Sequence, residues 1–236
     1  MLPREDFEFW LKRALKREHA QAATYDPVKD ELIGHKIFWH KVGSSPEEEE
    51  ALLPLTPTGH HRALFLDRDG IINVDGGYIH KVEDVTFVAG IEKIIALANS
   101  LELKVVVLTN QSGIGRGYYR EDEVLMLHQW MGSELQKKGA KVDAWYYSPY
   151  HPDAEEERYK KASYTRKPMP GMALLAAMDH SLNIEKSFMI GDKVSDVLAQ
   201  VDIPTFLLKG NYPLGNYPNS FDSLDEILER LTVVFR

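Results

Sequence analysis

The chain has 236 residues, of which 44% are hydrophobic, so it can bury one sizeable core in one or two domains. Its formal net charge of -8, with no basic stripe, argues against a nucleic-acid partner, and its lack of cysteine excludes disulfides and thiolate metal sites. No apolar run approaches the roughly 20 residues of a membrane span, and the first residues lack the apolar core of a signal peptide. We therefore expect a cytoplasmic protein with no membrane partner.

Residues 1–60 differ from the rest of the chain, and we predict that they form an N-terminal helical extension in front of a main domain at residues 61–236. A short strand is expected at residues 36–40, and Ser-Pro-Glu-Glu at residues 45–48 is typical of a helix start. The first helix has an apolar stripe formed by Phe7, Trp10, Leu11, Ala14 and Leu15. This stripe must pack against the main domain or a second subunit, so self-association through the N-terminal helix is one expectation.

From Arg62 onward, short apolar segments alternate with amphipathic ones. The predicted strands are residues 63–66, 105–108, 144–147, 188–190 and 205–208. The predicted helices are residues 90–100, 121–138, 170–181, 195–201 and 223–231. This alternation indicates an α/β fold of three layers with a Rossmann-like parallel sheet. Ligands of such sheets bind at the carboxyl ends of the strands.

Four polar segments stand at those strand ends or just before a helix. They are Asp67-Arg-Asp69-Gly70, the segment Thr-Asn-Gln-Ser-Gly at residues 109–113, Arg166-Lys167-Pro168, and the segment Gly-Asp-Lys-Val-Ser-Asp at residues 191–196. Each one alone is a weak signal, because a solvated turn would explain it as well. All four in order make a chance match improbable. The set resembles the signature of the haloacid dehalogenase superfamily, whose members include phosphatases that transfer phosphate through an aspartate.

The carboxylates of this set suit the cleavage of a phosphate monoester. The ester is a dianion that repels a carboxylate nucleophile, so the reaction needs a metal ion and a cation to neutralise charge. Asp67 is the candidate nucleophile, and Asp69 is the candidate acid for the leaving alkoxide and base for the attacking water. Asp67, the carbonyl of Asp69 and Asp192 would form an oxygen site for Mg²⁺.

Other residues of the set are expected to bind the transferring phosphoryl group. Thr109 and the backbone of Asn110 would hold its oxygens, and Lys167 would neutralise its growing charge. Asp196 leaves two interpretations open, because it can support the metal site or Lys193, or serve as a charge at a helix start. The tyrosines at 118, 119, 146 and 147 are predicted to pack rather than to bind substrate.

Within the superfamily, the sequence is most similar to the heptose bisphosphate phosphatase family, over about residues 62–208. The resemblance rests on the segments at residues 65–78, 109–117, 166–172 and 190–193. It implies a small phosphorylated sugar as substrate, in the synthesis of heptose precursors of lipopolysaccharide. The substrate-binding residues that it implies are Asp75, Gly76, Gly77, Tyr78, Gln111, Ser112, Arg166 and Lys193. A phosphatase of another small metabolite, such as histidinol phosphate, and a partner-binding protein with residual activity remain alternatives.

The spacing of the motifs and the residues of one loop give two further predictions. Only residues 68–108 lie between Asp67 and Thr109, which leaves no space for a large cap domain. The family usually binds zinc through Cys and His residues in the loop that corresponds to residues 148–165. At those positions the chain has Ser148, Tyr150, Ser163 and Thr165, whose neutral hydroxyls are poor zinc ligands, so we predict that no zinc is needed.

Overall fold

The computed structural model describes residues 59–234. The predicted N-terminal helix with its apolar stripe, the strand at 36–40 and the helix start at 45–48 lie outside the described residues, and so does self-association through that helix. Within the described part, no helix is long and apolar enough to cross a membrane.

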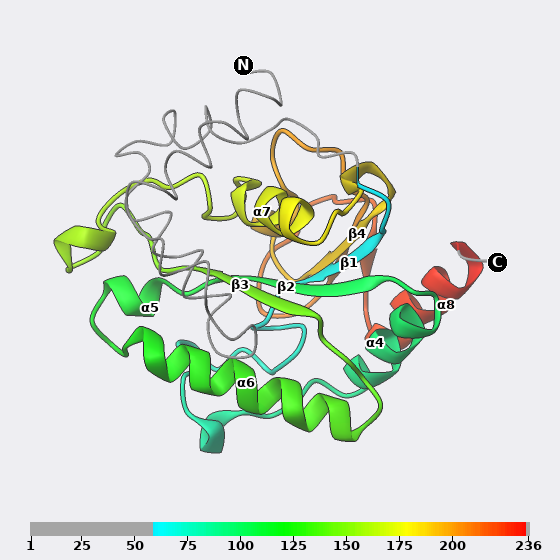
Figure 1. The fold of residues 1–236 in the computed structure, drawn as a ribbon, viewed down its shortest axis with the longest axis horizontal. Helices are drawn as coiled ribbons and strands as arrows, with labels where there is room; N and C mark the ends of the chain where they lie inside the picture. The colour runs from blue at the N-terminus through cyan, green and yellow to red at the C-terminus, as the bar shows by residue number, and fades with distance from the viewer. Residues whose placement is uncertain (1–58, 235–236) are drawn as a thin grey trace.

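A parallel sheet of six strands forms the centre of the described chain, in the order β3-β2-β1-β4-β5-β6 (Figure 1). The strands are β1 (Ala63–Leu66), β2 (Lys104–Asn110), β3 (Ala144–Ser148), β4 (Phe188–Gly191), β5 (Thr205–Leu208) and β6 (Ser220–Phe221). The register places Leu66 opposite Val107 of β2 and Ile190 of β4. Because β2 and β3 lie on one side of β1 and β4, β5 and β6 lie on the other, the strand order reverses between β1 and β4.

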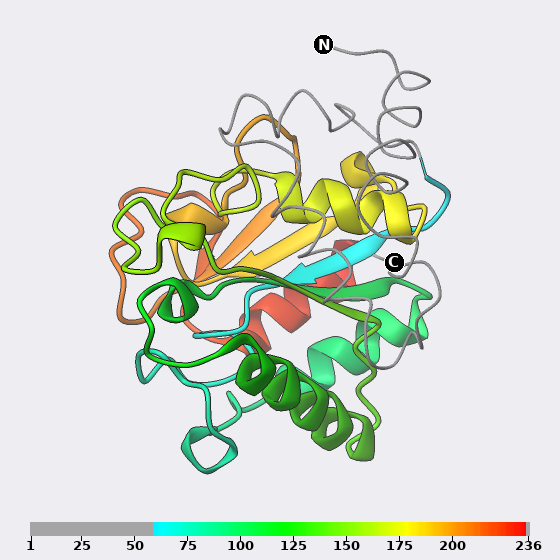
Figure 2. The same cartoon turned by 60° about the vertical axis from the view of Figure 1, so that its left-hand side comes forward.

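Helices cover both faces of the sheet, as the two views in Figures 1 and 2 show. One face carries α7 (Gly171–Asp179), and the other carries α4 (Ile91–Ser100), α6 (Glu121–Lys137) and α8 (Leu224–Val234). The alternation of side chains along β1 explains this arrangement, because Ala63 and Phe65 pack with the α7 side and Leu64 and Leu66 with the other. The predicted three-layer α/β fold is confirmed for the described residues.

The sequence explains why two of these helices, α4 and α6, form where they do. In α4 the buried residues are spaced at i, i+3, i+4 and i+7, and they are Ile91, Ile94, Ile95 and Ala98. At the start of α6, the carboxylate of Glu123 accepts a hydrogen bond from the backbone N–H of Arg120 at 2.8 Å, and three acidic residues fill the first turn. The strong periodicity and the acidic start made these two helices predictable to within one residue at either end.

One predicted helix is wrong, and two short elements were not predicted. Residues 195–201 do not form an α-helix, because only a 3-10 turn, η5 (Val194–Asp196), follows β4. The carboxylate of Asp196 instead accepts hydrogen bonds from the backbone N–H groups of Asp192 and Lys193, both at 3.1 Å, and this local bonding competes with a helix. The strand β6 and the short helix α5 (Ser112–Gly115) are too short to give a periodic signal.

No cap domain is inserted at either of the two places where the chain passes the edge of the sheet that bears the polar motifs. Between β1 and β2 the chain contains only a 3-10 turn, η2 (Val82–Asp84), and α4. Between β3 and α7 it contains a loop with one further 3-10 turn, η3 (Glu157–Tyr159). Loops and short helical turns therefore border the carboxyl ends of β1, β2 and β4.

Candidate active site

The nucleophile candidate Asp67 sits directly after β1, where its backbone N–H continues the sheet by bonding to the carbonyl of Ile190 at 3.0 Å. One carboxylate oxygen, Oδ1, accepts from the N–H of Arg68 at 2.7 Å and lies 2.9 Å from the ammonium group of Lys167. The other oxygen, Oδ2, makes no hydrogen bond with the described residues. Asp67 thus has one oxygen held in place and one available for a ligand.

A buried lysine joins two carboxylates at this site. The Nζ atom of Lys167 lies 2.9 Å from Asp67 and 2.6 Å from Asp196, and all three side chains are buried. Burial lowers the pKa of Lys167, but Asp196 and then Asp67 outweigh it and raise the pKa above its usual value. Lys167 therefore stays a cation at the point where a phosphoryl group would meet Asp67. Of the two interpretations of Asp196, a role beside the catalytic groups fits this position.

The carboxylates of Asp67, Asp192 and Asp196 offer oxygens that lie within 4.8 Å of one another. Burial raises the pKa of Asp67 to about 6 and that of Asp192 to about 7, and repulsion between the carboxylates adds to both shifts. The buried Oδ1 of Asp192 makes no hydrogen bond among the described residues. Such a cluster is costly without a cation, and its all-oxygen donors fit a hard divalent ion such as Mg²⁺.

Asp196 is less free to bind a cation than its two neighbours. Its Oδ2 atom already accepts from two backbone N–H groups, and its Oδ1 atom contacts Lys167. The residues present therefore fit an ion held by Asp67 and Asp192, with Asp196 fixing the lysine. Gly70 allows the Asp192 carboxylate to lie close to the backbone at residue 70. It adopts φ 93°, and a Cβ atom there would lie 2.1 Å from that carboxylate.

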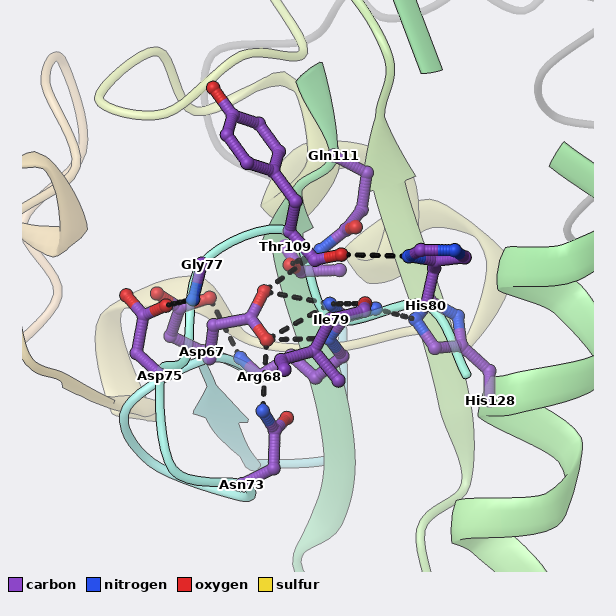
Figure 3. A network of polar contacts seen from close by, with 12 residues as sticks. Asp67, Arg68, Asn73, Asp75, Gly77, Ile79, His80, Thr109, Gln111 and His128 are labelled. Carbon is purple, nitrogen blue, oxygen red and sulfur yellow. Dashed lines mark hydrogen bonds and ion pairs between the residues drawn. The ribbon is translucent and has the colours of Figure 1, made fainter. Parts of the chain in front are cut away.

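The carboxylate of Asp69 is fixed by three side chains rather than by the metal cluster. The three side chains, Arg68, Asn73 and Gln111, are labelled in Figure 3. Arg68 donates to both of its oxygens at 2.8 to 3.1 Å, Asn73 donates to Oδ1 at 3.0 Å, and Gln111 donates to Oδ2 at 3.0 Å. The sequence motifs alone predict no role for Arg68 or Asn73. The sequence does contain a signal for an ion pair of Arg68, because this residue stands between two aspartates in the chain.

Residues at the carboxyl end of β2 hold other residues of the site in place through hydrogen bonds. The side chain of Asn110 donates to the carbonyl of Lys167 at 3.1 Å and accepts from its N–H at 3.0 Å, which ties the end of β2 to the lysine segment. Gln111 donates to the hydroxyl of Thr109 at 2.8 Å and accepts from Tyr119 at 2.8 Å. Ser112 begins α5. In this geometry the Gln111 side chain holds Asp69 and Thr109, and its contact with substrate stays a prediction.

A second group of polar residues lies next to Asp192, whose carboxylate is 3.9 Å from the ammonium group of Lys193. The carboxylate of Asp75 accepts from the N–H of Gly77 at 2.9 Å, from Lys193 at 3.1 Å and from the hydroxyl of Tyr212 at 2.7 Å. Burial raises the pKa of Asp75, but these donors outweigh it and leave the pKa below its usual value. Asp75 also borders a cavity of about 160 Å³ that Asp192 lines. The sequence does not predict this contact of Tyr212, because Tyr212 lies in a loop far along the chain from Asp75.

The tyrosines differ in their surroundings. Tyr119, Tyr146 and Tyr147 are buried, which confirms that they pack, although Tyr119 also supports Gln111. Tyr118 is 53% exposed, and its ring contacts the ring of Tyr78 edge-on with 4.8 Å between centroids. Tyr78 follows Gly76 and Gly77 and has φ 54°, so this segment turns sharply and presents the Tyr78 ring at the surface.

A second cationic group begins one residue before Lys167. Arg166 is partly buried and donates to the carbonyl of Tyr150 at 3.2 Å. Burial and then the neighbouring Arg116 lower the pKa of Arg166, and the same two guanidinium groups help to lower the pKa of His151 after burial. The buried Nε atom of Arg116 has no hydrogen-bond partner among the described residues. Two guanidinium groups that repel each other form a place where an anion would be stabilised.

Hydroxyl groups fill the positions at which the family usually binds zinc. Ser148, Tyr150, Ser163 and Thr165 are all buried. The hydroxyl of Thr165 lies 3.2 Å from that of Ser148 and 2.9 Å from that of Ser163, and the N–H of Thr165 donates to Ser163 at 3.2 Å. These bonds connect the end of β3 with the segment that carries Arg166 and Lys167. Hydrogen bonds thus join two segments that a metal clip would otherwise join.

Comparison with known proteins gives sequence relatives that cover more than half of the chain. The chain is 46% identical over 137 residues to D-glycero-beta-D-manno-heptose-1,7-bisphosphate 7-phosphatase of Photorhabdus laumondii, which covers 58% of this chain and 73% of that protein. It is 46% identical over 139 residues to the D-glycero-alpha-D-manno-heptose enzyme of Burkholderia mallei, covering 59% and 74%. The beta enzyme of Escherichia coli K12 is 40% identical over 140 residues, covering 59% and 73%. No protein-family model matches the chain.

Solved structures show the same architecture. The structure of an HAD-like phosphatase from Mesorhizobium loti aligns with a TM-score of 0.67 and 30% identity, covering 75% of this chain and 87% of that one. D,D-heptose 1,7-bisphosphate phosphatase from B. bronchiseptica, solved with magnesium and phosphate, aligns with a TM-score of 0.61 and 27% identity, covering 72% and 98%. The described fold is therefore shared with phosphatases of known structure.

Proposed function

Since this chain belongs to the D-glycero-D-manno-heptose-1,7-bisphosphate 7-phosphatase family of the haloacid dehalogenase phosphatases, we propose that it removes one phosphate from D-glycero-D-manno-heptose 1,7-bisphosphate. Relatives named for the beta and for the alpha anomer are both 46% identical to this chain. The observation that carries the proposal is the position of Lys167 and Arg166. Lys167 is a buried cation beside the nucleophile Asp67. Arg166 is a second cation near Arg116, where a second phosphate can bind.

The carboxylates and the lysine divide the reaction between them. Asp67 attacks the phosphorus, and the bond from phosphorus to the sugar oxygen breaks while Asp69 gives that oxygen a proton. Asp69 then takes a proton from water, and the hydroxide releases inorganic phosphate and restores Asp67. Lys167 stabilises the charge on the phosphoryl oxygens in both steps, because it stays cationic and 2.9 Å from Asp67.

Mg²⁺ is the cation that we propose for the acidic cluster, held by Asp67, Asp192 and the carbonyl of Asp69. When bound, the ion would neutralise the negative charge of the nucleophile and of the phosphoryl group. Thr109 and the N–H of Asn110 would bind phosphoryl oxygens. The segment from Asp75 to Tyr78, together with Lys193, would hold the sugar beside the cavity that Asp192 borders.

Arg166 gives the proposed specificity for a bisphosphate. A guanidinium group can bind a phosphate through two hydrogen bonds, and Arg116 adds a second positive charge. We expect kcat/KM to be higher for the heptose 1,7-bisphosphate than for the 7-phosphate. In Arg166→Ala this preference should fall about 10- to 100-fold, because a charge-assisted bond contributes on the order of 1.5 to 3 kcal/mol.

The matched control for this prediction is Arg158→Ala. Arg158 is an exposed cation of the same loop that pairs with Glu156, so its removal changes the net charge without touching the site. Steady-state kinetics with both substrates would separate the two variants. Equal efficiencies for bisphosphate and monophosphate in the wild type and in Arg166→Ala would contradict the proposed role of Arg166. A higher efficiency for histidinol phosphate than for either sugar would refute the proposed substrate.

A second prediction concerns the metal content. Protein purified without added metals should contain less than about a tenth of an equivalent of zinc, because the loop hydroxyls are poor zinc ligands. Activity should disappear with EDTA and return with Mg²⁺ alone, because the acidic cluster offers only oxygen donors. Elemental analysis and a metal titration of activity would measure both effects. Stoichiometric zinc that survives dialysis against a mild chelator, and whose later removal lowers stability, would show that the loop binds the metal in another way.

A further inference from the structure

A buried histidine on α6 lies next to the group that holds Asp69. The side chain of His128 is 1% exposed. Its ring stacks on that of Trp145 with 4.7 Å between centroids, and its edge meets Tyr147. The aromatic neighbours therefore fix the plane of the ring. The polar contact of His128 is with Arg68, whose Nη1 atom lies 3.3 Å from Nε2 (Figure 3).

The chemistry of this contact determines the tautomer. An arginine nitrogen can only donate, so Nε2 of His128 must accept and Nδ1 must carry the proton. Burial and then the charge of Arg68 lower the pKa of His128 far below its usual value, which keeps the ring neutral. The buried Nδ1 atom has no hydrogen-bond partner in the described part of the chain. A buried donor without a hydrogen-bond partner lowers the stability of the fold. If the position were purely structural, an apolar residue of similar size would therefore be favoured there.

Arg68 connects His128 to the reaction. Its side chain is fully buried, and two of its nitrogens, Nε and Nη2, bind the carboxylate of Asp69. Nη2 also donates to the carbonyl of Ile79 at 2.7 Å. Nη1 is left with His128 as its hydrogen-bond partner among the described residues. Without that acceptor, one side of the guanidinium group would have no hydrogen bond to keep it in the plane of the Asp69 carboxylate.

We propose that His128 is a positioning residue for catalysis, which accepts a hydrogen bond from Arg68 and thereby aims the Asp69 carboxylate at the leaving oxygen. This proposal rests on the acid role that we propose for Asp69. A proton donor must lie within hydrogen-bond reach of the leaving group, and a displacement of about 1 Å can cost on the order of 100-fold in rate. His128 touches neither the substrate nor Asp69, so its effect should be smaller.

The test compares two substrates that differ in their need for an acid. Glucose 6-phosphate has an alkoxide leaving group that requires a proton, whereas p-nitrophenyl phosphate has a leaving group that departs without one. In His128→Leu, kcat/KM for glucose 6-phosphate should fall about 10-fold, and for p-nitrophenyl phosphate less than about threefold. In His128→Gln the side-chain carbonyl can take the place of Nε2, so both values should stay within about threefold of the wild type. His128→Asn, whose oxygen is too close to the backbone, should behave like His128→Leu.

Two further variants make the result unambiguous. Val124→Ala, one turn earlier on α6, removes buried methyl groups, so it should lower Tm without changing the ratio of the two substrates. Asp69→Asn shows how strongly the ratio responds to loss of the acid itself. If Asp69→Asn slowed both substrates equally, the proposed acid role would fail, and the positioning role with it. If Asp69→Asn separated the substrates but His128→Leu did not, or if His128→Gln were no better than His128→Leu, His128 would be a packing residue.

Discussion

Asp67→Asn should lower the turnover of every phosphate ester by at least about 10,000-fold, because an amide cannot replace the carboxylate nucleophile. The substitution keeps the size of the side chain, and the amide oxygen can still accept from the N–H of Arg68. The protein should therefore stay folded. Wild-type enzyme quenched with acid during turnover should carry one phosphoryl group on the peptide that contains Asp67, and mass spectrometry should find none on the variant.

The control for this result is Asp143→Asn. Asp143 is a partly buried carboxylate, which accepts from the N–H of Val105 at 2.9 Å and pairs with Lys141 at 2.8 Å, but it lies at the opposite end of β2 from the site. Its loss should leave turnover within about twofold of the wild type, since changes far from the catalytic groups act mainly on stability. Near wild-type turnover in Asp67→Asn would show that the phosphoryl group does not pass through this aspartate.

The sequence was sufficient to predict the layers of the fold because two signals agree. The strands are short apolar runs with polar residues immediately after them, and α4 and α6 have apolar residues at helical spacing. In a parallel sheet the residues after the strands meet at one edge, so the neighbourhood of Asp67 and Asp192 followed from topology alone. The geometry that the structure adds is the ion pair of Lys167 with both Asp67 and Asp196.

The parts that could not be predicted depend on contacts between distant segments. Nothing in the sequence near Arg68 points to His128, which lies 60 residues later and reaches it because α6 packs beneath β2 and β3. Tyr212 reaches Asp75 in the same way, from the loop after β5. The helix predicted at residues 195–201 is wrong for a different reason. Their apolar spacing resembles that of a helix, but the hydrogen bonds of Asp196 to the backbone fold the chain back onto the end of β4.

Lys167→Met should lower kcat by about 1,000-fold, which is the second largest effect that we expect. The loss of one preorganised charge at a transition state typically costs 100- to 1,000-fold, and Lys167 is also the link between Asp67 and Asp196. Methionine matches the length of the lysine stem, so the packing of this buried side chain is retained. The two carboxylates then face each other without a cation, and this repulsion adds to the burial that already raises the pKa of the nucleophile Asp67.

A double variant separates the two contributions of Lys167. Lys167→Met combined with Asp196→Asn removes the uncompensated carboxylate, so Tm should recover relative to the single variant because a buried unpaired charge is costly. Turnover should not recover, because the charge that stabilises the phosphoryl oxygens is still missing. Thermal unfolding and steady-state kinetics on both variants would measure the two effects independently. Recovery of turnover in the double variant would mean that Lys167 acts only by neutralising Asp196, and the direct role of its ammonium group in phosphoryl transfer would then be wrong.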